Sequence, residues 1–467
     1  MTVGPPPSDR LPDGFAVRLD PAVQRRDGGA TLLGGSPLRL MRLSARAQAL
    51  LADRLTVRDA TTAELAARLL DAGMAAPDLR PRRPDDVTVV VPVRDRPREL
   101  ARLLAALRAD PSTATVPVIV VDDGSAEPVV AEGTTVLRHP TARGPAAARN
   151  TGLRAASTAT VAFLDSDCVP HAGWLDALAP HLDDPRLALV APRVVGLPAA
   201  RPTWLTPYED AVSALDMGER PAAVRPLSAV SYVPSAALLA RRAALGDGFD
   251  EDMPVAEDVD LVWRLVGAGW RVRYEPAAQV AHEHPAAPSA WLRRRAFYGT
   301  GAALLAARHG SAVAPLVISP SSAAVWLSLL AGRRGLLPAA GLLAVASGRL
   351  ARRLRRPGAP VPVAFAAGLV LRGTATAGTT LARSVTRHHW PPALLAALVS
   401  RRARRLVLAT ALADAALAWW PHRAAVGPLR FAAARRLEDL AYGAGLWTGA
   451  LRARDPRALL PAVPPRF

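Results

Sequence analysis

Two carboxylates one residue apart, Asp165 and Asp167, follow an apolar run at residues 161–164 and are the side chains around which the chemistry of this chain is expected to be organised. The apolar run predicts a buried strand, and open α/β sheets bind their ligands at the carboxyl ends of such strands. We therefore expect both carboxylates to be displayed at the edge of a sheet. Oxygen ligands at this spacing suit Mg²⁺ or Mn²⁺, whereas an ordinary acidic turn is the alternative interpretation of these residues taken alone.

The elements that position these carboxylates precede them in the chain. Residues 87–93 form an apolar run that predicts a strand, residues 98–108 carry leucines at helical spacing, and residues 116–121 form a second apolar run that ends at Asp122 and Asp123. A strand, a helix and a strand at this spacing predict a parallel α/β sheet with a nucleotide-sized crevice above it.

The composition disfavours several classes of protein. The 467-residue chain contains no lysine, so all 58 of its basic residues are arginine. Phosphate-loop NTPases, ordinary protein kinases and pyridoxal-phosphate enzymes each need a lysine and are therefore disfavoured. The single cysteine, Cys168, excludes an intrachain disulfide and a cysteine-cluster zinc site, and we interpret it as a packing residue rather than a nucleophile. The length of the chain predicts two or three domains.

Five motifs follow one another in an order and spacing that resemble those of the family 2 glycosyltransferases, which have the GT-A fold. They are Val-Pro-Val-Arg at 91–94, Asp-Asp-Gly-Ser at 122–125, Arg-Gly-Pro-Ala-Ala-Ala-Arg-Asn at 143–150, Phe-Leu-Asp-Ser-Asp at 163–167 and Ala-Glu-Asp-Val-Asp-Leu-Val-Trp-Arg-Leu at 256–265. The resemblance covers residues 87 to about 285. It implies a glycosyltransferase domain at residues 85–310 that uses a nucleotide-diphospho-sugar.

The resemblance also implies roles for individual residues. Asp123 would read the uracil of a UDP-sugar, Asp165 the ribose, and Asp167 the divalent metal, Mg²⁺ or Mn²⁺, that bridges the two phosphates. Because the chain has no lysine, a metal ion and arginine are the available means of stabilising the diphosphate. The other residues expected on the nucleotide-sugar side, with Arg149 as a further donor, are Pro92, Arg94, Arg143, Asn150 and Ser166. For Arg143, a solvated loop charge is the alternative interpretation.

Asp258 is the predicted catalytic residue. In the context of the motifs, one carboxylate near the sugar carbon suffices as a general base that deprotonates an acceptor hydroxyl, and in-line displacement then inverts the anomeric carbon. Ordinary capping of the helix predicted at residues 259–268 is the alternative. Glu257 is the next candidate for the base and is assigned to the acceptor or diphosphate side.

Two histidines and a basic aromatic segment follow the catalytic motif. His282 or His284 falls where many enzymes of this family place a third metal ligand, although imidazole is equally at home in a polar loop. Trp291, Arg294 and Arg295 are expected to serve the acceptor or diphosphate side, by stacking on sugar rings and by approaching the diphosphate. A plain basic amphipathic helix is the alternative for this segment.

Residues 10–80 are predicted to form a separate α+β module of three strands and two or three helices. The pattern resembles a winged helix and the PqqD-like peptide-recognition domains. Its edge at residues 38–43, with Leu40 and the helix at residues 65–70 forming an apolar groove, is the expected site for an extended peptide. A DNA-binding winged helix is the rival, but the charge of this segment is nearly balanced and duplex binding needs a concentrated basic face. No nucleic-acid partner is therefore expected.

The excess of positive charge lies in the C-terminal third of the chain. The net charge is +18, and residues 313–467 carry 22 arginines against 4 acidic residues. Short apolar stretches with arginine flanks suit helices that lie in a membrane interface, with one or two spanning hairpins as a variant. An alanine-rich packed helical domain is the alternative. Since the first 14 residues contain no secretory signal, we expect region 311–467 to hold the chain at the cytoplasmic face of the cell membrane.

Together these patterns predict an inverting, metal-dependent glycosyltransferase. The N-terminal module and the basic C-terminal region resemble the glycosyltransferases of mycofactocin-type systems. That resemblance implies transfer of a hexose, namely glucose, from a UDP-sugar to a peptide-derived acceptor, the mycofactocin precursor. The alternatives are an enzyme acting on a cell-envelope lipid or polysaccharide, and a non-catalytic nucleotide-sugar-binding protein.

Overall fold

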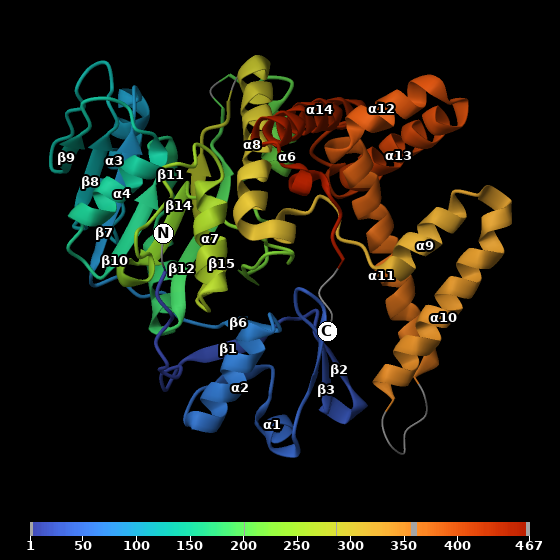
Figure 1. The fold of residues 1–467 in the computed structure, drawn as a ribbon. Coiled ribbons are helices and arrows are strands. Elements are labelled where there is room, and N and C mark those ends of the chain that lie inside the picture. The colour runs from blue at the N-terminus through green and yellow to red at the C-terminus, as the bar shows by residue number, and fades with distance from the viewer. Residues whose placement is uncertain (1–2, 200, 286, 356–361, 464–467) are drawn as a thin grey trace. The chain divides into compact units, whose positions relative to one another are not determined.

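The computed structural model of the chain describes residues 3–199, 201–285, 287–355 and 362–463 (Figure 1). Within these, the chain divides into two compact units, residues 1–286 and residues 287–467. Where a predicted segment includes residues 1–2, 356–361 or 464–467, that part of it falls outside the described residues. The division assigns residues 287–310 to the second unit, whereas the boundary expected from the sequence assigned them to the transferase domain.

The first unit is built around a nine-stranded mixed sheet with the order β11-β15-β12-β14-β10-β7-β8-β9, which β13 joins beside β15. β10, β7, β8 and β9 run parallel to one another, whereas β14 runs antiparallel to both β10 and β12. The strands are β7 (Val87–Val93), β8 (Val118–Asp122), β9 (Thr135–Arg138), β10 (Thr160–Leu164), β11 (Cys168–Pro170), β12 (Leu187–Gly196), β13 (Ala222–Ala223), β14 (Ala237–Arg241) and β15 (Arg271–His282). The helices are α3 (Pro97–Ala109), α4 (Pro145–Ala155), α5 (Trp174–Leu178), α6 (Thr206–Val212) and α7 (Glu257–Gly267).

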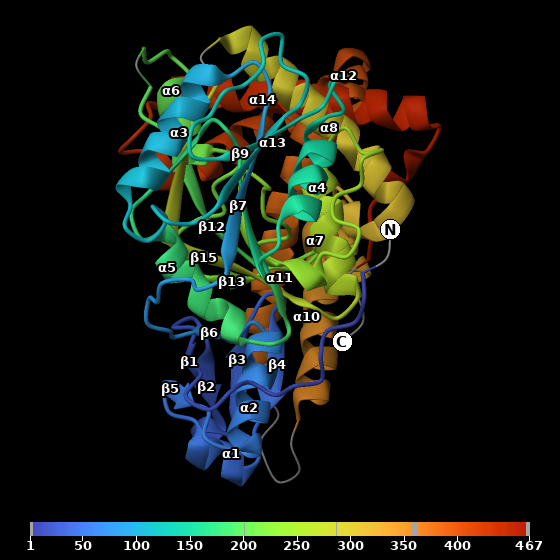
Figure 2. The same cartoon turned by 90° about the vertical axis from the view of Figure 1, so that its left-hand side faces the viewer.

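Helices α3 and α4 cover opposite faces of the parallel part of this sheet (Figure 2). On one face of β7, Val89 packs in the same core as Leu100 of α3. On the other face, Val90 lies against Gly152 of α4, where a Cβ would come 2.2 Å from the valine. Because β7 is buried on both faces, its sequence is an uninterrupted apolar run, as is usual for central parallel strands.

The N-terminal module contains two three-stranded sheets, with the orders β5-β1-β6 and β2-β3-β4. Its elements are β1 (Ala16–Leu19), β2 (Gln24–Arg26), β3 (Thr31–Gly34), β4 (Arg39–Arg42), α1 (Ala45–Leu50), β5 (Arg54–Thr56), α2 (Ala60–Asp71) and β6 (Ala75–Pro77). Three strands were expected, and they correspond to β1, β3 and β4. The other three, β2, β5 and β6, each pair over only three residues, and they form because they add to strands already present.

The apolar groove expected beside β4 differs from the observed structure. Leu65, Leu69 and Leu70 of α2 are buried in the core of the module. Leu40 of β4 is exposed, and β4 is an edge strand as expected. The leucines of α2 are therefore committed to the interior, because an amphipathic helix buries its single apolar face against its own sheet.

Ion pairs join the module to the transferase sheet within the first unit. Asp71, the last residue of α2, pairs with Arg271 at the start of β15 (2.8 Å), and the same guanidinium contacts Asp184 (3.0 Å). Arg271 and Asp184 are both buried. Because Asp184 already holds the Arg271 guanidinium in place, it offers the partly exposed Asp71 a fixed donor, and this charge-assisted pair links the module to the sheet.

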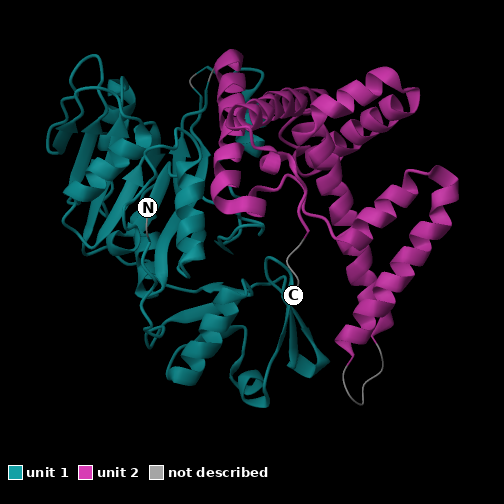
Figure 3. Cartoon of the chain, viewed as in Figure 1, with its two compact units in different colours: residues 1–286 teal, residues 287–467 magenta. Residues whose placement is uncertain are grey.

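The second unit is helical (magenta in Figure 3). Its α8 and α14 pack closely, since a Cβ on Gly445 would lie 1.8 Å from the carbonyl oxygen of Ala296, and one on Gly299 would lie 2.2 Å from that of Tyr442. Across the described residues, no helix is both long enough and apolar enough to cross a membrane. The helices are α8 (Pro288–His309), α9 (Pro320–Leu329), α10 (Leu336–Leu354), α11 (Val363–Arg383), α12 (Trp390–Val399), α13 (Arg401–Trp419) and α14 (Pro428–Ala453).

Candidate active site

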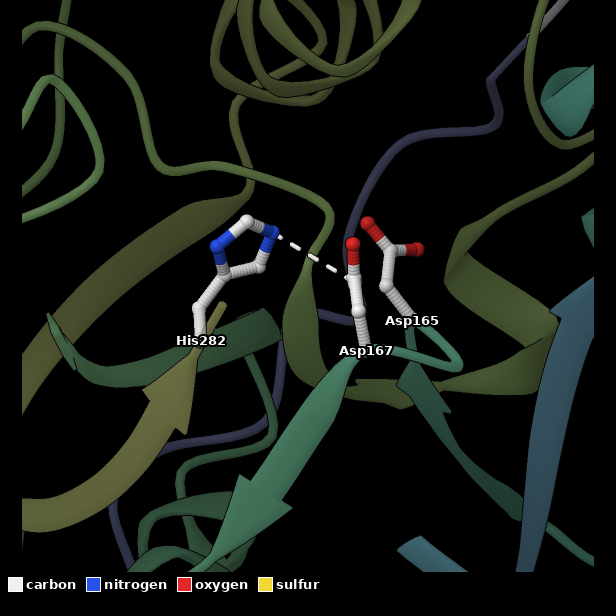
Figure 4. A group of neighbouring side chains, drawn as sticks. All are labelled: Asp165, Asp167 and His282. Carbon is white, nitrogen blue, oxygen red and sulfur yellow. Dashed lines mark ion pairs between the residues drawn. The ribbon is translucent and has the colours of Figure 1, made fainter. Parts of the chain in front are cut away.

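The two carboxylates of the central motif meet a histidine at the carboxyl end of β10. Asp165 and Asp167 follow β10 directly, and Cys168 begins β11, which pairs with β15 so that Cys168 lies opposite His282. This register brings His282 beside Asp167, with 3.4 Å between Nε2 of the histidine and Oδ1 of the aspartate (Figure 4). One ligand atom from each of Asp165, Asp167 and His282 lies within 4.8 Å of the other two.

The donor set of this cluster fits a divalent cation. Carboxylate oxygens are the usual ligands of Mg²⁺ and Mn²⁺, and neutral imidazole is a common metal ligand. Nδ1 of His282 is buried and has no hydrogen-bond partner among the described residues. His284, the other candidate ligand, lies instead 3.8 Å from Glu209 and 3.9 Å from Asp210. The structure thus gathers His282 with the two aspartates and leaves His284 apart from them.

Cys168, the first residue of β11, is fully buried. Burial raises the pKa of its thiol well above the ordinary value, and the neighbouring aspartates add to this effect. A thiol with a raised pKa is a poor nucleophile. The structure therefore favours the packing role expected for this cysteine.

Two arginines lie against the aspartates. Arg96, directly before α3, contacts Asp167, and Arg149 of α4 donates a hydrogen bond to Asp165 (2.6 Å) and another to Glu257 (3.0 Å). Burial lowers the pKa of the Arg149 guanidinium, but the carboxylates of Asp165 and Glu257 more than offset this, so that pKa lies above its ordinary value. Arg149 was expected to face the nucleotide and instead joins two carboxylates. Arg96 was not identified from the sequence, because nothing in its neighbours distinguishes it from other loop arginines.

Asp258 lies in the first turn of α7, beside Glu257. Its carboxylate accepts hydrogen bonds from the N–H groups of Ser235 (3.1 Å) and Val259 (2.8 Å). Burial, followed by repulsion from Glu257, raises the pKa of Asp258 to about 7. A carboxylate with this pKa exchanges protons near neutral pH, which is the property a general base needs.

Asp258 is not the N-cap residue of α7, although its carboxylate accepts a hydrogen bond from the N–H of Val259 in the first turn. The N-cap residue of α7 is Ala256, whose backbone has φ 65° and ψ 22° and whose side chain makes no capping hydrogen bond. A residue other than glycine in this left-handed region costs of order 1–3 kcal/mol, and such strain clusters at active sites. Asp258 also reaches across to Ser235, on the loop before β14. The strained turn therefore positions the two carboxylates that follow it.

Asp123 organises the loop at residues 139–144. Its Oδ1 accepts a hydrogen bond from the N–H of Arg143 (2.8 Å) and lies 2.8 Å from Nδ1 of His139, while its Oδ2 accepts from the N–H of Gly144 (2.8 Å). Each carboxylate oxygen can accept about two hydrogen bonds, so Oδ2 keeps capacity for one further donor. Base recognition by Asp123 remains a prediction. His139, which was not identified from the sequence, fixes the orientation of this carboxylate.

Four other residues expected on the nucleotide-sugar side lie in or directly after the strands and loops that carry the motifs. Pro92 lies in β7, and Ser166 is buried between the two aspartates. Arg94 is exposed directly after β7, and Arg143 is exposed and pairs with Glu251 (2.7 Å). Their roles toward the nucleotide remain predictions.

The side chain of Asn150 is hydrogen-bonded within the protein. Its amide N–H groups donate to the carbonyl of Phe249 (2.7 Å) and to Glu251 (3.0 Å), and its Oδ1 accepts from the N–H of Phe249 (2.8 Å). Both N–H groups of the amide are thus used within the protein. In this structure the side chain holds the loop that leads to α7, and its expected role toward the nucleotide remains a prediction.

Trp291, Arg294 and Arg295 belong to α8 in the second unit. The guanidinium of Arg295 lies 5.7 Å from the centroid of the Trp291 ring, and its Nε lies 3.9 Å from Glu438 of α14. The roles expected for these three residues on the acceptor or diphosphate side remain predictions.

The chain matches one family model and is similar to several curated proteins. Residues 88–245 match the family model for glycosyl transferase family 2. The chain is 48% identical over 479 residues to the pre-mycofactocin glycosyltransferase of Mycobacterium tuberculosis strain H37Rv, and the match spans 97% of this chain and 99% of that protein. A shorter match, 32% identical over 100 residues, covers 19% of this chain and 33% of glycosyltransferase AglE from Haloferax volcanii.

Among solved structures, the mannosyltransferase PcManGT from Pyrobaculum calidifontis in complex with GDP-Man and Mn²⁺ is 22% identical and has a TM-score of 0.37, covering 74% of this chain and 90% of that one. The family model and the nearly full-length relative are the matches that decide the family. The mixed sheet, with β14 inserted antiparallel between β10 and β12, is consistent with them. The chain therefore belongs to the family 2 glycosyltransferases and is a glycosyltransferase with a GT-A fold.

Proposed function

We propose that the chain is an inverting, metal-dependent hexosyltransferase that moves glucose from UDP-glucose to the peptide-derived precursor of mycofactocin. The observation that carries the proposal is that Arg149 contacts both Asp165 of the acidic cluster and Glu257, the neighbour of Asp258. One buried cation thereby joins the expected donor site to the residue directly before the expected general base. The choice of acceptor is supported by the relative that is 48% identical along 99% of its length and is named pre-mycofactocin glycosyltransferase.

In the proposed reaction, Asp258 accepts the proton of an acceptor hydroxyl while the hydroxyl oxygen attacks the anomeric carbon of the sugar. The new carbon–oxygen bond forms as the bond from that carbon to the diphosphate breaks, and UDP leaves with the electron pair. Attack from the side opposite the leaving group inverts the anomeric carbon, so an α-linked donor gives a β-linked product. Ser235 and Val259 hold the carboxylate through their N–H groups during this transfer.

The donor side must stabilise a leaving group with concentrated negative charge. A divalent cation held by Asp165, Asp167 and His282 would supply positive charge to the diphosphate. Two protein cations already contact the cluster, Arg96 at Asp167 and Arg149 at Asp165. Because the chain has no lysine, these groups are the expected source of compensation.

We test the metal requirement by measuring UDP binding calorimetrically in Mn²⁺ and in chelator. UDP affinity is expected to collapse in chelator and in Asp167→Ala, because the diphosphate then has too few compensating charges. Equal affinity in the two conditions would remove the metal from the proposal. Product analysis with the mycofactocin precursor, a polyprenyl phosphate and a polysaccharide then identifies the acceptor, and transfer to either of the last two would replace the peptide-derived one.

We further propose that the second unit binds the cytoplasmic face of the cell membrane through α12 and the start of α13. Leu395, Leu398 and Val399 of α12 are 65%, 69% and 88% exposed. The sequence Arg-Arg-Ala-Arg-Arg follows at residues 401–405. Exposed apolar side chains beside a cluster of arginines suit a helix that lies in the interface of an anionic membrane.

A further inference from the structure

A cavity of about 490 Å³ lies between the N-terminal module and the transferase sheet, within the first unit. Its walls include the end of β1 with the loop after it, β6 with the residue after it, β13, and residues 273–275 near the start of β15. The volume falls in the range of cavities that bind small molecules and short peptide segments. The lining contains none of Asp165, Asp167, Asp258 or His282, so the cavity is distinct from the candidate active site.

Two buried side chains in its wall carry nitrogen atoms without partners. His181 and Arg273 are each 4% exposed, and among the described residues neither Nδ1 of His181 nor Nη1 of Arg273 makes a hydrogen bond. Burying a polar atom without a partner costs about 1–3 kcal/mol, so a ligand that satisfies these atoms gains affinity. Burial, with the nearby Arg273, lowers the pKa of His181 to about 3. The imidazole is therefore neutral, with one donor and one acceptor nitrogen.

An amide group matches this pair of side chains. Arginine has donors only, so Nη1 of Arg273 needs an acceptor such as a carbonyl oxygen. Nε2 of His181 lies 3.5 Å from a carboxylate oxygen of Glu275. With the proton on Nε2, toward that carboxylate, Nδ1 is left as the acceptor for an N–H. The carbonyl and the N–H of a peptide chain can satisfy both atoms.

Two strand edges in the same cavity offer further partners to a peptide backbone. β6 is the edge strand of its sheet, and the N–H of Asp78 donates to the carbonyl of Ala16 in β1 (2.9 Å). Because successive N–H groups of a strand point to opposite sides in an antiparallel ladder, the N–H of Ala75 points away from β1. Among the described strands, β13 pairs with β15 alone, and the N–H of Val224 donates to the carbonyl of Val272 in β15 (2.9 Å). By the same alternation, the N–H of Ala223 points away from β15. Ala75 and Ala223 both line the cavity.

The charged side chains that line the cavity are balanced in number, with Arg18, Arg220 and Arg273 against Asp20, Asp78 and Glu275, so a preference for a negatively charged ligand rests on Arg220 alone. Arg220 lines the cavity, is exposed, and has no ion-pair partner within the described part of the chain. Arg18, which also lines it, already pairs with Asp78 (2.9 Å). Arg220 is therefore the group available to a carboxylate.

We propose that this cavity binds an extended peptide segment that carries a carboxylate. Its backbone adds to the edges of β6 and β13, one of its amide groups satisfies His181 and Arg273, and its carboxylate pairs with Arg220. The identification of this ligand with the peptide portion of the acceptor rests on the proposed function. It places peptide recognition on β6 and the transferase sheet, and not on the β4 edge expected from the sequence.

The test uses the full-length protein and a degenerate tetrapeptide pool with free carboxyl termini, scored by affinity selection and mass spectrometry. A retained subset of peptides is expected, and hydrogen exchange with the best of them should protect residues 73–78 and 219–224. Arg220→Ala should weaken binding about tenfold or more, as for the loss of a charge-assisted hydrogen bond. Ala75→Pro, which removes an outward N–H without breaking the ladder, should weaken it as well.

The matched control is Arg42→Ala, which removes an exposed arginine from the β4 edge and should leave binding unchanged. Hydrolysis of UDP-glucose by Arg220→Ala should equal that of the wild type, which also shows that the variant is folded. If the wild type hydrolyses UDP-glucose but retains no peptide beyond the level of the Arg220→Ala Ala75→Pro double variant, the cavity is not a peptide site. If Arg42→Ala loses binding and Arg220→Ala keeps it, the β4 edge is the site. Absence of UDP-glucose hydrolysis in the wild type would contradict the proposed function and not this inference.

Discussion

Replacing Glu257 by glutamine is expected to move the pH dependence of turnover to lower pH. The pKa of Asp258 is raised to about 7, first by burial and then by repulsion from Glu257. A general base acts in its deprotonated form, so kcat/KM for the acceptor should rise with pH through this pKa. For a pKa of about 7, the ionised fraction grows from about one tenth at pH 6 to about nine tenths at pH 8, a rise of about tenfold.

Two changes in the Glu257→Gln variant act in the same direction. The substitution removes a negative charge beside Asp258, and it takes from Arg149 one of its two carboxylate partners. Both effects favour the Asp258 anion, so its pKa falls. A fall of about one unit, equivalent to about 1.4 kcal/mol, would reduce the difference in kcat/KM between pH 6 and pH 8 to about twofold.

The assay is UDP release from UDP-glucose at saturating metal, followed from pH 5 to 9. Asp258→Asn should lower turnover by about 10²–10⁴ at every pH, which is the usual contribution of a positioned base. Asp252→Asn, an exposed carboxylate on the same loop, is the matched control and should leave the profile in place. An unchanged or upward-shifted profile in Glu257→Gln, or comparable turnover in Asp258→Asn, would refute the assignment of the base.

Stability provides a second readout of the same prediction. Because the folded state raises the pKa of Asp258 from 3.8 to about 7, it binds this proton more tightly than the unfolded chain does. The associated stability is present at low pH and is lost as pH rises from about 4 through 7. Asp258→Asn should therefore melt at a higher temperature than the wild type at pH 8, although its turnover is far lower.

Three further predictions concern the cluster, the buried arginine and the membrane surface. His282→Ala should weaken Mn²⁺-dependent UDP binding at least tenfold by calorimetry, whereas His284→Ala should not; similar effects of the two would contradict the cluster seen here. Arg149→Met should lower the free energy of unfolding in urea by about 3–5 kcal/mol, because it leaves two carboxylates uncompensated, and a loss below about 1 kcal/mol would show that the pairs contribute little. Replacing Leu395 and Leu398 by serine should reduce sedimentation of the protein with anionic vesicles, and undiminished binding would move the contact away from α12.

Local sequence is sufficient to predict those strands and helices whose pattern of apolar residues directly reflects which of their faces are buried. β7 and β10 were expected because a strand buried on both faces is a continuous apolar run, and α3 because its leucines recur at helical spacing. The motif positions of Asp165, Asp167 and Asp258 follow from the ends of such elements. For these residues, the local sequence pattern alone was enough to predict the strand or helix that they belong to or follow.

The N-terminal module shows where local pattern is insufficient. β2, β5 and β6 have three residues each, too few for a period to be recognised. They become strands only because a partner already lies beside them. The cavity between β6 and β13 follows from the same long-range pairing, since β13 has only two residues and depends entirely on β15.

The chemistry of the site divides in the same way. The sequence by itself determined the family, the acidic motif and Asp258 as the candidate base, because these depend on residue type and spacing. Tertiary structure decided that His282 and not His284 joins the aspartates, since the choice depends on the register that sets Cys168 opposite His282. It also decided that Arg149 joins carboxylates from two distant motifs and that the pKa of Asp258 rises to about 7. Burial and charge proximity are properties of the packed chain, and residues 100 positions apart acquire them only when the sheet has formed.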